Sequence, residues 1–211
     1  AAAAAAAPAS ASAPAGRKLD LAAEMSIEIY DELLDSAGNP FGCCSGALLF
    51  TEDTDALPSD PEITKTVDFT IGFTRMMRAL SDQDYLTFAK FQTVLKGSVH
   101  YPLFNAYYNG VSITMGQGLV VDDVLAHEWQ HGYTDYSSDL VYAYMSGAMN
   151  EALSDIFGEG YDLLNDNGEP LNAVPRSVFD CTAFEWNFRH FNGGDVSHRW
   201  LVGEEITQTS D

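Results

Sequence analysis

The stretch His127-Glu128-Trp129-Gln130-His131 places two histidines four residues apart, with a glutamate directly after the first. On an α-helix, side chains four positions apart lie on one face, one turn from each other, so both imidazoles can bind the same metal ion. Glu128 projects beside this pair, where it can accept a proton from water without being a ligand itself. The pattern therefore predicts a zinc site on a helix that also carries a general base.

A catalytic zinc site needs a third protein ligand, which comes from another element, and an open position for water. Glu151 is the candidate, because it follows His131 by 151 − 131 = 20 residues. That spacing lets the first helix end near residues 137–139 and a second helix pack beside it. Asp155 shares the helical face of Glu151, and together with Asn150 it can accept hydrogen bonds from the liganding imidazoles.

The same residues also have an interpretation without a metal. His127 and His131 would then be surface or core-edge residues on an amphipathic helix, Asn150 would cap a helix and Asp155 would be an exposed carboxylate. The five-residue motif alone arises by chance in roughly one chain in a hundred with this histidine content. The residues that follow the motif therefore decide between the two interpretations.

Residues 122–162 resemble the thermolysin-like zinc metalloendopeptidases without a gap. The matching stretches are Asp123-Val124-Leu125-Ala126-His127-Glu128, Gly132-Tyr133-Thr134-Asp135-Tyr136 and residues 147–158. Residues 98–101 and 105–110 resemble the edge-strand and substrate-cleft segment of that family, and residues 200–206 extend the similarity to the end of the chain. The resemblance implies an α+β fold of the zincin type. A strand-rich N-terminal lobe would place its edge strand over a zinc-binding helix pair, followed by an incomplete C-terminal helical lobe.

The resemblance also implies a role for each matching residue at the metal. The zinc ligands would be His127, His131 and Glu151, and Glu128 would be the general base. Asn150 and Asp155 would orient the two histidine rings.

Further matching residues would contact the substrate. Tyr142 would help to bind the oxyanion, and Asn105 and Ala106 would hydrogen-bond the substrate backbone as if it were an added strand. Val124 and Val202 would line an apolar pocket for the side chain after the scissile bond. For Tyr142 and the two valines, packing in the core is an equally good interpretation.

Calcium is the second cofactor that the resemblance implies. Asp123, Asp162 and Glu204 match calcium-binding carboxylates of the family, and hard cations prefer several converging oxygens. Arg199 and Leu201 stand where the family has two further carboxylates, so we expect one calcium site and not a pair. Because the chain has 31 Asp and Glu residues, a solvated acidic surface is the alternative.

The implied reaction is hydrolysis of internal peptide bonds in protein or peptide substrates. Zinc would activate water and polarise the peptide carbonyl, while Glu128 would accept a proton and deliver it to the leaving nitrogen. The resemblance also implies a secreted, extracellular protein.

The chain departs from the family pattern near its end. The family supplies an oxyanion-binding histidine and arginine after the segment that matches residues 203–204, and this chain ends at Asp211. His190 and His198 precede that match, in an insertion at about residues 165–198. A catalytically inactive remnant that binds zinc and calcium is therefore the alternative to an active peptidase. A different zinc hydrolase with the same five-residue motif is a third hypothesis.

Composition limits the classes of partner. The formal net charge of −21 and the pI near 4.2 disfavour nucleic acid and anionic membranes, which would repel the chain. A run of 18 or more apolar residues, typical of a transmembrane helix, does not occur. The three cysteines, Cys43, Cys44 and Cys181, allow one of the adjacent pair to bridge Cys181, which leaves an odd thiol.

We expect three regions along the 211 residues. Residues 1–18 form an Ala, Ser and Pro-rich segment that we expect to be disordered and that does not resemble a secretory signal. Residues 19–118 would form the N-terminal α+β lobe, and residues 119–211 the zinc-binding helical region with the insertion.

Periodicity predicts several elements. A helix capped by Asp60-Pro61 should run to about Leu80 and bury an apolar stripe of Ile63, Val67, Phe69, Ile71, Phe73, Met76, Met77 and Leu80. Strands are expected at 93–101 and 111–115, joined by a turn at 105–110, and Asp122 should cap the zinc helix. Residues 19–34 fit an amphipathic helix, whereas the family resemblance indicates strands there.

Overall fold

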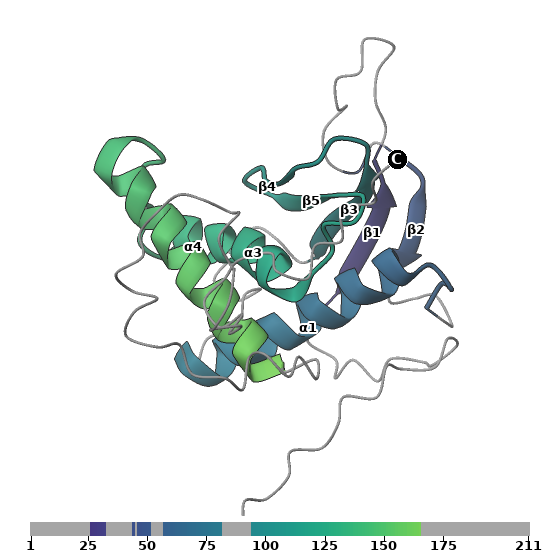
Figure 1. The fold of residues 1–211 in the computed structure, drawn as a ribbon, viewed down its shortest axis with the longest axis horizontal. Coiled ribbons are helices and arrows are strands. Elements are labelled where there is room, and N and C mark those ends of the chain that lie inside the picture. Colours follow the sequence, from purple (N-terminus) through teal and green to yellow (C-terminus); the bar gives the residue numbers. More distant parts are fainter. Residues whose placement is uncertain (1–25, 33–43, 45, 52–56, 82–93, 166–211) are drawn as a thin grey trace, which may run out of the picture.

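The computed structural model describes residues 26–32, 44, 46–51, 57–81 and 94–165 (Figure 1). The expected disordered segment at 1–18, the insertion after residue 165, Val202 and Glu204 lie outside these residues. Cys44 is described and is disulfide-bonded. Cys43 and Cys181 lie outside the described part of the chain. Within that part, no helix combines the length and the apolar character needed to cross a bilayer.

The described residues form a mixed five-stranded sheet and three helices. The elements in chain order are β1 (Ile27–Asp31), β2 (Leu48–Thr51), α1 (Pro61–Ser81), β3 (Leu95–Tyr101), β4 (Ala106–Tyr108), β5 (Ser112–Gly116), α3 (Asp122–Ser137) and α4 (Tyr144–Asn165). The strand order is β2-β1-β3-β5-β4. The central strands β1, β3 and β5 are parallel, and the two edge strands run antiparallel to their neighbours. The expected α+β class is confirmed.

All three helices lie on the same side of the sheet (Figure 1). α1 contacts β1 and β3, whereas α3 contacts β4, β5, α1 and α4. One hydrophobic cluster joins the sheet to these helices, and it includes Ile29, Ile113, Phe73, Trp129 and Tyr161. The helix that carries His127 and His131, α3, is therefore packed between the sheet and the other two helices.

α1 confirms the predicted helix. Asp60 caps it by accepting the Glu62 backbone N–H at 2.8 Å, and the helix runs from Pro61 to Ser81. Its buried face includes Ile63, Val67 and Met77, as expected. The assignment of Leu80 to the core is wrong, because the whole last turn at 78–81 is exposed and Leu80 keeps 65% of its surface.

The strands β3 and β5 confirm the two predicted strands with slightly shifted ends, but the expected turn at 105–110 is wrong. Residues Ala106–Tyr108 form the edge strand β4, as the family resemblance indicated. The reversal is compressed to residues 109–111: Asn109 Oδ1 accepts the backbone N–H of Ser112 at 2.9 Å, and Gly110 has φ +95°. Glycine adopts that backbone region without steric cost, so a very short turn suffices.

Within residues 19–34, for which a helix and strands were both expected, residues Ile27–Asp31 form the strand β1. Ile27 and Ile29 point into the core with 1% exposure each, while Glu28 and Tyr30 alternate with them. This period of two matches a half-buried strand, so the helical interpretation is wrong for these five residues.

The start of α3 differs from the prediction. Asp122 is not the cap: Val121 occupies that position with extended backbone, and it makes no side-chain capping hydrogen bond. Asp122 and Asp123 lie within the first turn, where carboxylates interact favourably with the helix dipole. The helix ends as expected, since Asp139 adopts φ +49° and donates its backbone N–H to the Thr134 carbonyl at 2.9 Å.

Two contacts fix α3 against the other helices. Trp129, within the histidine motif, is buried and donates its indole N–H to Thr70 Oγ1 of α1 at 2.9 Å. Gly158 lets α4 approach α3 closely, because a Cβ atom at this position would lie only 2.6 Å from the Asp123 carbonyl oxygen. The close approach of α3 and α4 thus requires a residue without a Cβ atom at position 158.

Replacing Gly158 by Ala should lower the free energy of unfolding by about 1–3 kcal/mol, because the new methyl group must push the helices apart. Gly160 on the same helix is the matched control, since a Cβ there meets no atom within 4 Å. Gly160→Ala should stabilise the protein by about 0.5–1 kcal/mol through helix propensity. Urea denaturation followed by circular dichroism measures both, and equal effects of the two substitutions would contradict the close-packing argument.

Candidate metal centre

Three side chains from the two packed helices converge on one point. The Nε2 atoms of His127 and His131 are 3.0 Å apart. Glu151 of α4 places Oε2 3.2 Å from His127 Nε2 and Oε1 3.8 Å from His131 Nε2. Among the described residues, this is the only group of three or more His, Cys, Asp or Glu side chains whose ligand atoms all lie within 4.8 Å of one another.

The spacing of these atoms fits zinc. Zinc binds nitrogen and oxygen ligands at about 2.0–2.2 Å in a tetrahedron, which places neighbouring ligand atoms about 3.3 Å apart. The distances of 3.0, 3.2 and 3.8 Å lie on either side of that value. Three ligands leave the fourth corner of the tetrahedron open, as a catalytic site requires.

The other ring nitrogens show which tautomer each histidine adopts. His127 Nδ1 lies 2.9 Å from Asp155 Oδ1, and His131 Nδ1 lies 2.7 Å from Asn150 Oδ1. Because both Nδ1 atoms face acceptor oxygens, they carry the ring protons and the Nε2 lone pairs point toward each other and Glu151. Burial and then the neighbouring His131 lower the pKa of His127, which also favours its neutral form. Two lone pairs and a carboxylate at this spacing favour a cation.

The alternative interpretations of Asn150 and Asp155 are not supported. Asn150 lies within α4 and is 1% exposed, so it does not cap a helix. Asp155 is half exposed but pairs with His127. Ser154, which sequence analysis missed, places its Oγ 3.1 Å from His131 Nδ1. Its position one turn after Asn150 was the signal that could have identified it.

Glu128 is buried beside the metal site with 6% of its surface exposed. Burial, followed by the negative charge of Glu151, raises the pKa of Glu128 to about 8, although a hydrogen bond from the Tyr108 backbone opposes this shift. That backbone belongs to β4, so the edge strand holds the carboxylate of the expected general base. The group can therefore both take up and release a proton near neutral pH.

Tyr142 lies in the connection between α3 and α4. Its ring packs edge-on against His131, with centroids 6.0 Å apart, and its hydroxyl donates a hydrogen bond to Glu151 Oε1. The side chain is 66% exposed, so the core-packing interpretation is wrong for Tyr142.

The expected substrate-contacting residues occupy two places. Asn105 is exposed just before β4, and Ala106 begins this strand at the outer edge of the described sheet. Val124 of α3 is partly buried and packs against the core, which agrees with the packing interpretation for that residue. Val202 lies outside the described residues.

Two of the three expected calcium ligands are buried in the helix pair. Asp123 of α3 and Asp162 of α4 are each 2% exposed, so a solvated acidic surface does not describe them. Glu204 lies outside the described residues, and the calcium site stays a prediction.

Comparison with known proteins agrees with this geometry. No family model matches the chain. A zinc metalloproteinase of Renibacterium salmoninarum is 46% identical over 72 residues, which cover 34% of this chain and 13% of that protein. A neutral protease of Vibrio proteolyticus is 54% identical over 61 residues, which cover 26% of this chain and 10% of that protein. The chain thus spans only a small part of the length of the curated relatives it matches.

The fold has a similar solved structure, the precursor of protealysin, a metalloproteinase from Serratia proteamaculans. The TM-score is 0.57 at 25% identity, and the match covers 68% of this chain and 45% of that chain. The expected resemblance to the thermolysin-like zinc metalloproteinases is therefore confirmed in both sequence and fold.

The protein should bind about one zinc ion, and His131→Ala should reduce the zinc content to near zero because only two ligands remain. Atomic absorption on the purified protein measures the stoichiometry. His100→Asn, measured on folded protein, is the control, because this substitution removes a histidine that contacts Asp31, Asp60 and Glu62 and none of the three ligands, so the zinc content should stay unchanged. Unchanged zinc in the His131 variant would reject the assignment.

Asp155→Ala should weaken zinc binding by about 10–100-fold, because His127 loses the partner that fixes its tautomer and ring orientation. Competition with a chromogenic chelator measures the dissociation constant. Asp155→Asn keeps an acceptor oxygen, so its zinc affinity should lie between that of the wild type and that of the alanine variant. Equal affinities in all three proteins would show that Asp155 does not support the site.

Proposed function

We propose that this chain contains the zinc-binding part of a thermolysin-like metalloendopeptidase that hydrolyses internal peptide bonds in proteins or peptides. The observation that carries the proposal is the convergence of His127, His131 and Glu151 at tetrahedral spacing beside the buried Glu128. The names of the similar proteins, a zinc metalloproteinase and a neutral protease, support the same reaction class.

The chain's own residues would divide the reaction between them. Zinc held by the three ligands would supply Lewis-acid chemistry, activating water and polarising the peptide carbonyl. Glu128 takes the proton of the attacking water and delivers it to the leaving nitrogen, a role that its burial beside the three ligands supports. Tyr142, whose hydroxyl donates to Glu151 Oε1 in the absence of substrate, would turn this single O–H donor to the developing oxyanion.

The substrate backbone would bind along β4. This strand pairs only with β5 among the described strands, so its outer edge offers backbone groups to an extended peptide. Asn105 and Ala106 lie at the start of that edge and would hydrogen-bond the substrate. Val124 and Val202 would favour an apolar side chain after the scissile bond.

Calcium and secretion complete the proposal. Asp123, Asp162 and Glu204 would hold one structural calcium ion, supported by the burial of the first two carboxylates between α3 and α4. The family resemblance supports an extracellular location. Neither nucleic acid nor an anionic membrane suits a chain with a formal net charge of −21.

A quenched peptide with Leu or Phe after the scissile bond should be hydrolysed by the wild type and not by Glu128→Gln. The loss should reach at least about 10²-fold, the usual contribution of a general base. The zinc content of Glu128→Gln should stay unchanged because Glu128 is not a ligand. Zinc binding without any Glu128-dependent cleavage would instead support the inactive zinc-binding remnant, which shares every ligand with the active enzyme.

A further inference from the structure

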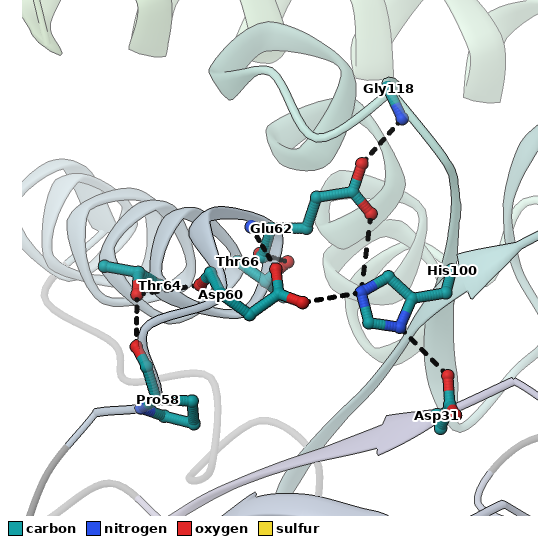
Figure 2. Close-up of polar contacts among 8 residues, drawn as sticks. All are labelled: Asp31, Pro58, Asp60, Glu62, Thr64, Thr66, His100 and Gly118. Carbon is teal, nitrogen blue, oxygen red and sulfur yellow. Dashed lines mark hydrogen bonds and ion pairs between the residues drawn. The ribbon is translucent and has the colours of Figure 1, made fainter.

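His100 lies outside the candidate metal site, near the end of β3, in a backbone conformation that is uncommon for residues other than glycine. Its φ is +61°, in the left-handed region, and the pairing of β3 with β5 shifts register between Ser98 and Tyr101. The resulting bulge turns the imidazole away from the strand and toward the start of α1 (Figure 2). The side chain is one-third exposed at the junction of three segments.

Carboxylates from two elements face this ring. Asp31 of β1 places Oδ1 2.9 Å from His100 Nδ1. At the start of α1, Asp60 Oδ2 lies 3.1 Å and Glu62 Oε2 lies 3.8 Å from His100 Nε2 (Figure 2). Among the described residues, these three are the charged groups that act on the imidazole. The loop before α3 contributes only a backbone group, the Gly118 N–H, which Glu62 Oε1 accepts at 2.7 Å.

The contacts of His100 with Asp31 and Asp60 are both hydrogen bonds to carboxylates if each ring nitrogen carries a proton. A neutral imidazole donates from one nitrogen only, so the lone pair of the other would face a carboxylate oxygen at about 3 Å and repel it. The imidazolium form donates from both nitrogens and carries the charge that offsets the three carboxylates. The observed geometry is therefore that of the charged ring.

The same carboxylates have structural tasks of their own. Asp60 caps α1 through its other oxygen, and Glu62 holds Gly118, four residues before the start of α3. His100 thus joins the central sheet, the start of α1 and the loop that leads into the metal-binding helix.

We propose that His100 is a pH-dependent tie: its imidazolium form holds the start of α1 and the loop before α3 to the sheet, and loss of the ring proton releases this contact. Burial alone lowers the pKa of His100, but the hydrogen bond with Asp31 and the charges of Asp60, Glu62 and Asp31 outweigh it, so the pKa is raised above its usual value. The proposal does not depend on the peptidase function.

The sign of the pH dependence follows from linkage. A histidine whose pKa is higher in the folded than in the unfolded state stabilises the fold fully below the unfolded value of about 6.5. The stabilisation is lost as the pH rises through the folded pKa. Other groups, Glu128 among them, also titrate, so the contribution of His100 must be measured as a difference between two proteins.

His100→Asn isolates that difference. Asparagine tolerates a positive φ and forms hydrogen bonds, but it carries no titratable charge. Urea denaturation of the full chain in the presence of a chelator should give the wild type a higher midpoint at pH 6, and the gap to the variant should shrink toward zero at pH 9. A gap of the same size at both pH values, or no gap at all, would overturn the proposal.

A direct titration keeps the proposal testable if His100→Asn does not fold. Proton NMR of the imidazole C–H resonances of the wild type should show a histidine with a pKa above about 6.5, the reference value. Asp60→Asn retains helix capping but removes one charge beside the ring, so it should lower that pKa. A His100 pKa at or below the reference value, or one unaffected by Asp60→Asn, would contradict the tie.

Discussion

The close packing of α4 against α3 is the constraint on which the rest of the site depends. His127 and His131 occupy one face of α3, but they become a three-ligand site only because α4 brings Glu151 to within hydrogen-bond distance of His127. The backbone approach at Gly158 sets this separation, and Asn150, Ser154 and Asp155 then orient the rings. The ligands and their supporting residues are therefore placed by a single helix-helix contact.

The candidate metal site could be predicted in part from local spacing, whereas Glu151 was assigned from its separation from His131 and from the family resemblance. Helical spacing fixes His127 and His131 on one face, and the same spacing relates Glu151 to Asp155. The long amphipathic helix α1 was predictable for the same reason, since 21 residues carry enough turns to define a buried face. Ser154 was missed although it followed the same periodicity, because serine has too many roles in helices to indicate one.

The remaining differences involve contacts between distant residues. β4 has three residues, too few for a period of two to be visible, and its pairing with β5 depends on the short turn at residues 109–111. Leu80 follows the apolar pattern of α1, but the sheet and helices do not reach its last turn. The contacts of His100 with Asp31 and Asp60 span 69 and 40 residues of sequence, and no local pattern indicates them.

The Tyr108 backbone of β4 hydrogen-bonds the Glu128 carboxylate, so in the proposed peptidase the geometry of the sheet would influence which bond is cut. The same three-residue strand would align an extended peptide and already aims the proton acceptor. A peptide displaced by two residues along β4 would move by one full side-chain repeat, about 7 Å, and present a different amide to Glu128. In the proposed peptidase, the register of the peptide along β4 would therefore select which amide lies beside Glu128.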